Sequence, residues 1–209
     1  MFPERIETDR LELTALTPEN VPVLDYYDIC SGNAGDDIDT VTEHLPWEPH
    51  DTPKETKEFL DRLADQRAAG ENAEFLVRPS DRDDEANDSP GDATTDAIAG
   101  AVGLAPHWDR RTGELGIWLR EPFWGRGYYG EAFAELTRVA FDLLDLAAVE
   151  IVHRHGNANS RRATEKFVAR FGGRHEGRLR NYWTGPAGPA DAHRYTVTRE
   201  EWVEATKGD

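Results

Sequence analysis

GELGIWLREPFWGRGYYGEA, residues 113–132, joins a strand pattern to the start of an amphipathic helix through a turn rich in glycine and aromatic residues. Apolar residues after Tyr129 recur at positions i, i+3, i+4 and i+7, which predicts a central helix beginning in this stretch. The first turn of a helix presents backbone N–H groups without intrahelical acceptors and the positive end of the helix dipole. Because Gly125 and Gly127 let a ligand approach the backbone there, the stretch predicts either a plain glycine turn or a phosphate site, to which Arg126 would add charge.

Two common phosphate-binding patterns do not fit this chain. The sequence has no Gly-x-x-x-x-Gly-Lys-Ser/Thr loop. The dinucleotide fingerprint requires an early strand–helix–strand unit, whereas this loop lies late in the chain, after several short strands. Nucleotide hydrolysis and hydride transfer are therefore disfavoured.

The remaining elements follow from hydrophobic spacing and from helix start signals. Alternating or short apolar runs predict strands at 10–16, 73–79, 97–104, 112–119, 147–153, 174–179 and 193–198. A first helix is predicted after Thr17-Pro18, and a second from Thr52 to Gly70. The central helix is predicted to continue through Leu143, a fourth helix to start at Asn159 or Ser160, and a terminal helical turn to lie at 199–202. The acidic segment 80–95 is too polar to be ordered by burial, so we expect a mobile loop within one domain of residues 1–209.

Charge and cysteine content limit the function classes. The chain has 41 acidic and 24 basic residues, a formal net charge of -17, which disfavours nucleic acid as a partner. Such a surface either attracts a cationic substrate or suits concentrated salt, as in halophilic proteins. Cys30 is the single cysteine, so no intramolecular disulfide or cysteine-based zinc cluster can form. With no apolar run of membrane-spanning length and no signal pattern, a cytoplasmic protein without membrane contact is expected.

Several motifs in order carry a family resemblance. The opening run, followed by GNANSRRATEK and then EGRLRN, resembles the RimJ/RimL-type branch of the GNAT superfamily of acetyl-CoA-dependent N-acetyltransferases, and the similarity runs from TDRLELTALTPEN to RYTVTREEW. The resemblance implies an α/β fold with a mixed, twisted, mostly antiparallel sheet of about six to seven strands, a splayed parallel pair, and about four flanking helices. It also implies acetyl-CoA as co-substrate.

The resemblance further implies which residues bind acetyl-CoA. The strand segment that pairs with the pantetheine arm corresponds to Ile117, Trp118 and Leu119. The pyrophosphate loop corresponds to Gly125, Arg126, Gly127, Tyr128, Tyr129 and Gly130. Asn157 corresponds to an asparagine that hydrogen-bonds the cofactor. The pattern departs at Tyr129, which stands where a small residue is usual.

Acetyl transfer needs a base for the amine and an acid for the departing thiolate. Glu114 is the candidate base, directly or through water, although an exposed strand glutamate is the simpler interpretation. Ser160 is the candidate acid, or else a plain helix N-cap. We expect direct attack by a primary amine, either a protein N-terminal α-amine or a small amine, in a ternary complex. The alternative is a non-catalytic acyl-CoA-binding or regulatory module, and a homodimer through exposed strand edges is left open.

Several histidines and aromatic residues are weaker candidates. His153 and His155, at i and i+2 without a carboxylate partner pattern nearby, make a weak metal site, so an ordinary surface pair and no metal are expected. His107-Trp108 and residues 44–47 are expected on loops near the substrate entrance.

Overall fold

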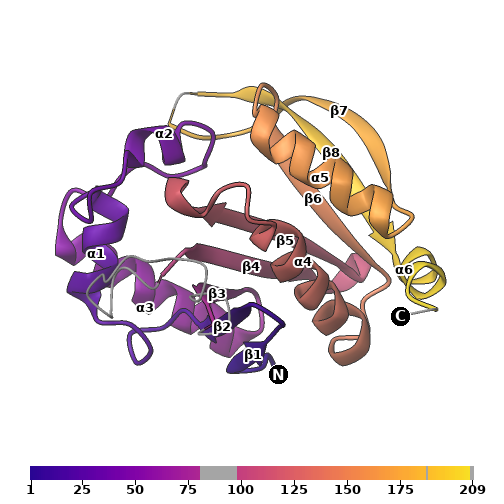
Figure 1. The fold of residues 1–209 in the computed structure, drawn as a ribbon, viewed down its shortest axis with the longest axis horizontal. Coiled ribbons are helices and arrows are strands. Elements are labelled where there is room, and N and C mark those ends of the chain that lie inside the picture. Colours follow the sequence, from indigo (N-terminus) through magenta and orange to yellow (C-terminus); the bar gives the residue numbers. More distant parts are fainter. Residues whose placement is uncertain (81–97, 187, 208–209) are drawn as a thin grey trace.

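A single mixed sheet forms the centre of the computed structural model, which describes residues 1–80, 98–186 and 188–207 (Figure 1). Its eight strands are β1 (Arg5–Glu7), β2 (Leu11–Ala15), β3 (Ala73–Pro79), β4 (Gly100–His107), β5 (Thr112–Leu119), β6 (Ala148–Arg154), β7 (Arg174–Trp183) and β8 (Ala190–Thr198). They lie in the order β1-β2-β3-β4-β5-β6-β8-β7. Every neighbouring pair is antiparallel except β5 and β6. The expected mixed, mostly antiparallel sheet is confirmed.

Helices cover both faces of this sheet. The described chain contains α1 (Val23–Ser31), α2 (Ile38–Thr42), α3 (Pro53–Ala69), α4 (Tyr128–Arg138), α5 (Ala158–Arg170) and α6 (Arg199–Ala205). One apolar core joins the sheet to α4 and α5 through residues such as Phe75, Phe133 and Phe167. A second core, which includes Tyr26 and Leu60, joins the other face to α1 and α3. Consecutive residues of the central strands therefore alternate between the two cores.

The structure changes several expected boundaries. The first helix begins at Val23, because the Thr17 carbonyl closes a turn by accepting from the Asn20 and Val21 amides at 3.1 and 3.2 Å. The short elements β1 and α2 were not expected, and the strand expected at 97–104 is β4. The predicted mobile loop at 80–95 lies outside the described residues except for Ser80. Among the described helices, none has the length and apolar character needed to cross a membrane.

The parallel strands β5 and β6 pair over only part of their length. Their register runs from Thr112 opposite Ala148 to Leu115 opposite Ile151. Beyond that point β5 pairs only with β4, and β6 pairs only with β8. Figure 1 shows the two strands running apart from the end where they pair. The sheet therefore opens at Gly116, which confirms the splayed pair.

Candidate active site

A cleft of about 1890 Å³ follows the opening between β5 and β6. Most of the predicted site residues line it: Glu114, Ile117, Trp118, Leu119, Gly125, Gly127, Tyr129, Gly130, Asn157 and Ser160. The predicted loop residues Arg126 and Tyr128 do not. Tyr128 is buried in the core, and Arg126 donates from Nε to the Pro122 carbonyl at 3.1 Å. Three separate segments of the sequence therefore contribute predicted site residues to one cleft.

The glycine loop leaves the N-terminus of α4 uncovered. Gly125 and Gly127 have φ values of 76° and 86°, in the left-handed region that favours glycine. Gly127 is the N-cap of α4 and supplies no side-chain cap, so the dipole end of the helix faces the cleft. At the other end of the loop, Trp124 Nε1 donates to the Leu119 carbonyl at 2.7 Å, which ties the loop to β5. The loop fits an anionic group such as a diphosphate.

Arg10, in the turn between β1 and β2, holds this loop in place through hydrogen bonds. Its Nη1 donates to the Arg126 carbonyl at 3.0 Å, and its Nε donates to Glu131 Oε2 at 2.8 Å in the first turn of α4. Thr8 Oγ1 donates to the same carboxylate at 2.6 Å. The sequence analysis missed this contact, because its partners are more than 100 residues apart.

We expect Arg10→Ala to loosen the loop and to weaken acetyl-CoA binding. Loss of two charge-assisted contacts at a partly exposed site corresponds to about 1 kcal/mol, or roughly a fivefold rise in the KM for acetyl-CoA with a smaller change in kcat. Steady-state kinetics measure both constants. Arg5→Ala is the matched control, because Arg5 pairs with the exposed Glu7 and with Glu12, away from the loop. An unchanged KM in the Arg10 variant would contradict the bracing role.

Tyr129 turns away from the loop and toward α5. Its hydroxyl lies 2.7 Å from Thr164 Oγ1, with the Ser160 side chain as a second polar neighbour, and its ring packs on Phe133 at 4.3 Å between centroids. Burial raises the pKa of Tyr129, so this hydroxyl keeps its proton at neutral pH. The large side chain that departs from the family pattern therefore lies beside Ser160 and leaves the loop backbone accessible.

Asn157, and neither Asn159 nor Ser160, caps helix α5. Its Oδ1 accepts from the Ser160 amide at 2.9 Å, and the helix begins at Ala158. The proposed N-cap role of Ser160 is therefore wrong, and Ser160 lies in the first turn of the helix. This position brings its hydroxyl to the cleft wall, beside Tyr129.

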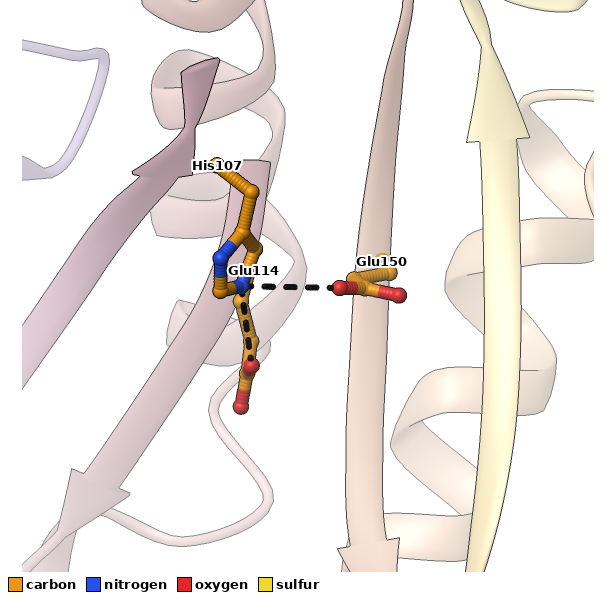
Figure 2. A group of neighbouring side chains, drawn as sticks. All are labelled: His107, Glu114 and Glu150. Carbon is orange, nitrogen blue, oxygen red and sulfur yellow. Dashed lines mark ion pairs between the residues drawn. The ribbon is translucent and has the colours of Figure 1, made fainter. Parts of the chain in front are cut away.

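Glu114 meets two further titratable side chains on the face of the sheet opposite α4. Figure 2 shows His107, from the end of β4, between Glu114 and Glu150 of β6. His107 Nε2 lies 3.6 Å from Glu114 Oε2 and 3.7 Å from Glu150 Oε1. Glu114 lines the cleft and is about half exposed, whereas Glu150 is buried. His107 Nε2 is thus within ion-pair distance of both carboxylates but hydrogen-bonds neither.

These three side chains are also of a kind that binds metal ions, since their ligand atoms all lie within 4.8 Å of one another. Glu150, however, already meets two cations: Arg110 Nη2 at 3.0 Å and Arg194 Nε at 3.3 Å. A metal ion here would face both guanidinium groups, so the charges disfavour metal binding. That the site uses no metal stays a prediction.

Aromatic side chains line the cleft on the sheet face that carries Glu114. Trp118 of β5 packs against Trp47 at 5.4 Å between centroids, and Trp47, His44 and Trp183 line the cleft. The expected loop position of residues 44–47 near the cleft is confirmed, but His107 ends β4 instead of lying on a loop. This side of the cleft lies across the sheet from the loop and from α4.

The expected surface pair of histidines is only half right. His155 is exposed, with Nδ1 2.9 Å from His193 Nε2. His153 is buried and stacks on Tyr195 and His193. Burial lowers the pKa of His153, so its ring is neutral at physiological pH. The alternation of strand β6 could have indicated this, because His153 follows Val149 and Ile151 on the core face.

Comparison with known proteins places this arrangement in context. A family model described as an acetyltransferase (GNAT) domain matches residues 10–169. FsC-acetyl coenzyme A-N(2)-transacetylase from Aspergillus fumigatus is 35% identical over 96 residues, which are 45% of this chain and 39% of that protein. The match thus spans well under half of that relative.

Solved structures share the fold at low sequence identity. The microcin C7 self-immunity acetyltransferase MccE, solved with acetyl-CoA and AMP, has a TM-score of 0.75 and 16% identity, covering 94% of this chain and 97% of that one. RimL, a ribosomal L7/L12 α-N-protein acetyltransferase solved with coenzyme A, has a TM-score of 0.70 and 19% identity, covering 93% and 98%. At these identities the likeness shows the fold alone.

Proposed function

The chain belongs to the GNAT acetyltransferase family, and from this premise we propose that it transfers the acetyl group of acetyl-CoA to a primary amine by direct attack in a ternary complex. The observation that supports this most is the opening of the sheet at Gly116, with an uncovered helix N-terminus on one side and a carboxylate on the other. The family match is to enzymes, which disfavours the alternative of a non-catalytic binding module.

The residues proposed to hold acetyl-CoA divide into two groups. The backbone of Ile117, Trp118 and Leu119 lacks a β6 partner, so its outward groups can pair with the amide-rich pantetheine arm. Backbone amides from Gly125 to Gly130 would receive the pyrophosphate at the start of α4. Asn157 still has its side-chain N–H groups for the co-substrate, because its Oδ1 is the atom that caps α5. Arg126 would add charge at the loop rim.

The co-substrate supplies an activated acyl thioester. The protein must then remove protons from the attacking nitrogen and supply one to the departing thiolate. We assign Glu114 as the base that accepts a proton from the attacking nitrogen, with His107 beside it. Ser160 would protonate the departing thiolate, and the Tyr129 hydroxyl, which keeps its proton, is its polar neighbour on the cleft wall. A backbone N–H near Trp118 would stabilise the oxyanion.

The acceptor is proposed as either a protein N-terminal α-amine or a small amine. RimL is named for α-N-acetylation of a ribosomal protein, and the Aspergillus relative is named for transfer to an N(2) position. The aromatic wall of Trp47 and Trp118 suits the apolar part of either acceptor, and the net charge of -17 suits an acceptor that arrives as an ammonium ion.

An acceptor screen tests this function. Free thiol release from acetyl-CoA is measured with short peptides, with the same peptides carrying blocked N-termini, and with small alkyl amines, at low and at high salt. We expect thiol release that requires a free primary amine. If the acidic surface steers the acceptor, kcat/KM falls as salt rises, because the Debye length shrinks to about 3 Å at 1 M. Thiol release that no amine accelerates at either salt concentration would contradict the proposal.

A further inference from the structure

A second carboxylate, Glu74 of β3, shares a row of the sheet with the point where the sheet opens. Glu74 lies opposite Gly103 of β4, and Gly103 lies opposite Gly116 of β5. Residues directly opposite one another in antiparallel strands point to the same face. Two of the three positions in this row have no side chain, so the Glu74 side chain meets no obstacle between β3 and the opening.

The Glu74 carboxylate lies along this row. A Cβ atom at Gly103 would be only 2.2 Å from Glu74 Oε1 and 2.6 Å from Oε2, so the carboxylate lies directly over Gly103. A Cβ atom at Gly116 would meet nothing within 4 Å. The carboxylate therefore points toward open space above Gly116, and both Glu74 and Gly116 line the cleft.

The contacts of the Glu74 carboxylate do not compensate for its burial. Within the described residues its one side-chain hydrogen bond comes from Asn72 Nδ2 at 3.4 Å, and no arginine or lysine there forms an ion pair with it. The buried Tyr26 of α1 is a titratable neighbour that interacts with the Glu74 charge, and this interaction raises the pKa of Tyr26 further, so the phenol stays neutral. A desolvated carboxylate with so little compensation costs stability. Burial raises the pKa of Glu74 to about 7. A group whose pKa lies near neutral pH, in a cleft and without a structural partner, is typical of a site that exchanges protons.

We propose that Glu74 is the second carboxylate of the active site: it receives the acceptor's ammonium group in the open space over Gly116 and removes the first of the two protons that the nitrogen must lose. This proposal rests on the acetyl transfer proposed above, with the thioester carbonyl at the opening of the sheet. Glu114, two residues from Gly116 on the same strand face, would remain the base for the second proton.

The protons and bonds balance with these groups. The ammonium passes one proton to Glu74 and becomes a neutral amine. Its nitrogen lone pair then forms the C–N bond as the C–S bond breaks, and the nitrogen gives its second proton to Glu114. Ser160 returns a proton to the departing thiolate and regains one through Tyr129 and solvent. The net reaction consumes an ammonium and a thioester, and yields an amide, a thiol and one proton.

The isosteric variant Glu74→Gln tests the inference. At pH 7 we expect kcat/KM for the acceptor to fall at least about tenfold, with the KM for acetyl-CoA and the thermal shift given by CoA unchanged. Wild-type kcat/KM should rise with pH through about 7, because only the ionised carboxylate accepts a proton. We expect Glu74→Gln to lose this limb of the pH profile, that is, the rise in kcat/KM through about pH 7. Glu71→Gln, an exposed glutamate three residues away, is the matched control and should behave as wild type.

Thermal unfolding gives a readout that does not depend on activity. The raised pKa means that folded Glu74 binds its proton more tightly than the unfolded chain does, so stability falls as the pH rises from about 4.5 and the loss is complete above about pH 7. Glu74→Gln should therefore unfold at a higher temperature than wild type at pH 8, and the difference should shrink toward pH 5. A lower Tm at every pH would mean that the side chain serves packing, and would overturn the inference.

A second variant tests the path over Gly116. Gly116→Ala places a methyl group in open space, so the Tm should not fall, but the acceptor KM should rise at least about tenfold because the methyl occupies the ammonium position. Wild-type kinetics in this variant, or a retained limb near pH 7 in Glu74→Gln, would overturn the inference while acetyl transfer stands. If the wild type itself shows no amine-dependent thiol release, the proposed function fails instead.

Discussion

Gly127→Glu is expected to abolish acetyl-CoA binding and to lower kcat/KM for acetyl-CoA on the order of 1,000-fold. The new carboxylate would stand at the N-cap of α4, where the pyrophosphate is proposed to bind, and would repel it. Gly127 also has a φ of 86°, and a Cβ atom there would lie 3.3 Å from Arg10 Nη2. The new glutamate could therefore form an ion pair with the Arg10 guanidinium, which in the wild type hydrogen-bonds the loop.

The thermal shift given by CoA measures this loss directly. Gly35→Glu is the matched control, since Gly35 has a φ of 89°, is exposed, and would meet nothing within 4 Å. It imposes the same backbone strain outside the cleft and should leave CoA binding unchanged. A Gly127→Glu variant that keeps the wild-type thermal shift would show that the glycine loop is not the pyrophosphate site.

This loop is the part of the site that local sequence could predict. A helix start, two glycines and the preceding strand are all encoded within residues 113–132, so spacing alone placed them correctly. Arg10 was missed because its partner Glu131 lies 121 residues away. Strand order, and not local pattern, brings the turn between β1 and β2 beside α4.

Glu74 shows the same limit more sharply. Its strand pattern AEFLVRP indicates a buried strand with an acidic residue next to its start, which is a signal that could have been noticed. What it faces depends on the registers of two strand pairs, and no local pattern fixes those. The short elements β1 and α2, of three and five residues, were missed because neither is long enough to show a period.

Tyr129 explains one departure from the family pattern. In the sequence it stands where the family usually has a small residue. The helix begins at Tyr128, so Tyr129 projects from the first turn toward α5 and packs on Phe133. The loop keeps its accessible backbone, and the hydroxyl gains a place beside Ser160.

Glu114→Gln is the second large effect that we expect, with a loss in kcat of roughly 100- to 1,000-fold and little change in the KM for acetyl-CoA. The amide cannot accept the second proton from the attacking nitrogen. Its shape is preserved, and Glu114 is about half exposed, with His107 at 3.6 Å as its one ion-pair partner among the described residues, so the Tm should change little. Steady-state kinetics with a good amine acceptor, together with thermal unfolding, measure both effects.

The pH profile separates this carboxylate from Glu74. If Glu74 removes the first proton, Glu114→Gln should keep the rise in kcat/KM through about pH 7, because the group that produces it is still present. Glu12→Gln is a suitable control, since Glu12 lies on β2 in an exposed pair with Arg5. Turnover equal to wild type in Glu114→Gln would contradict its role as the base. Loss of the limb near pH 7 in that variant would instead assign both protons to Glu114, because removing one carboxylate would then remove the whole pH-dependent step.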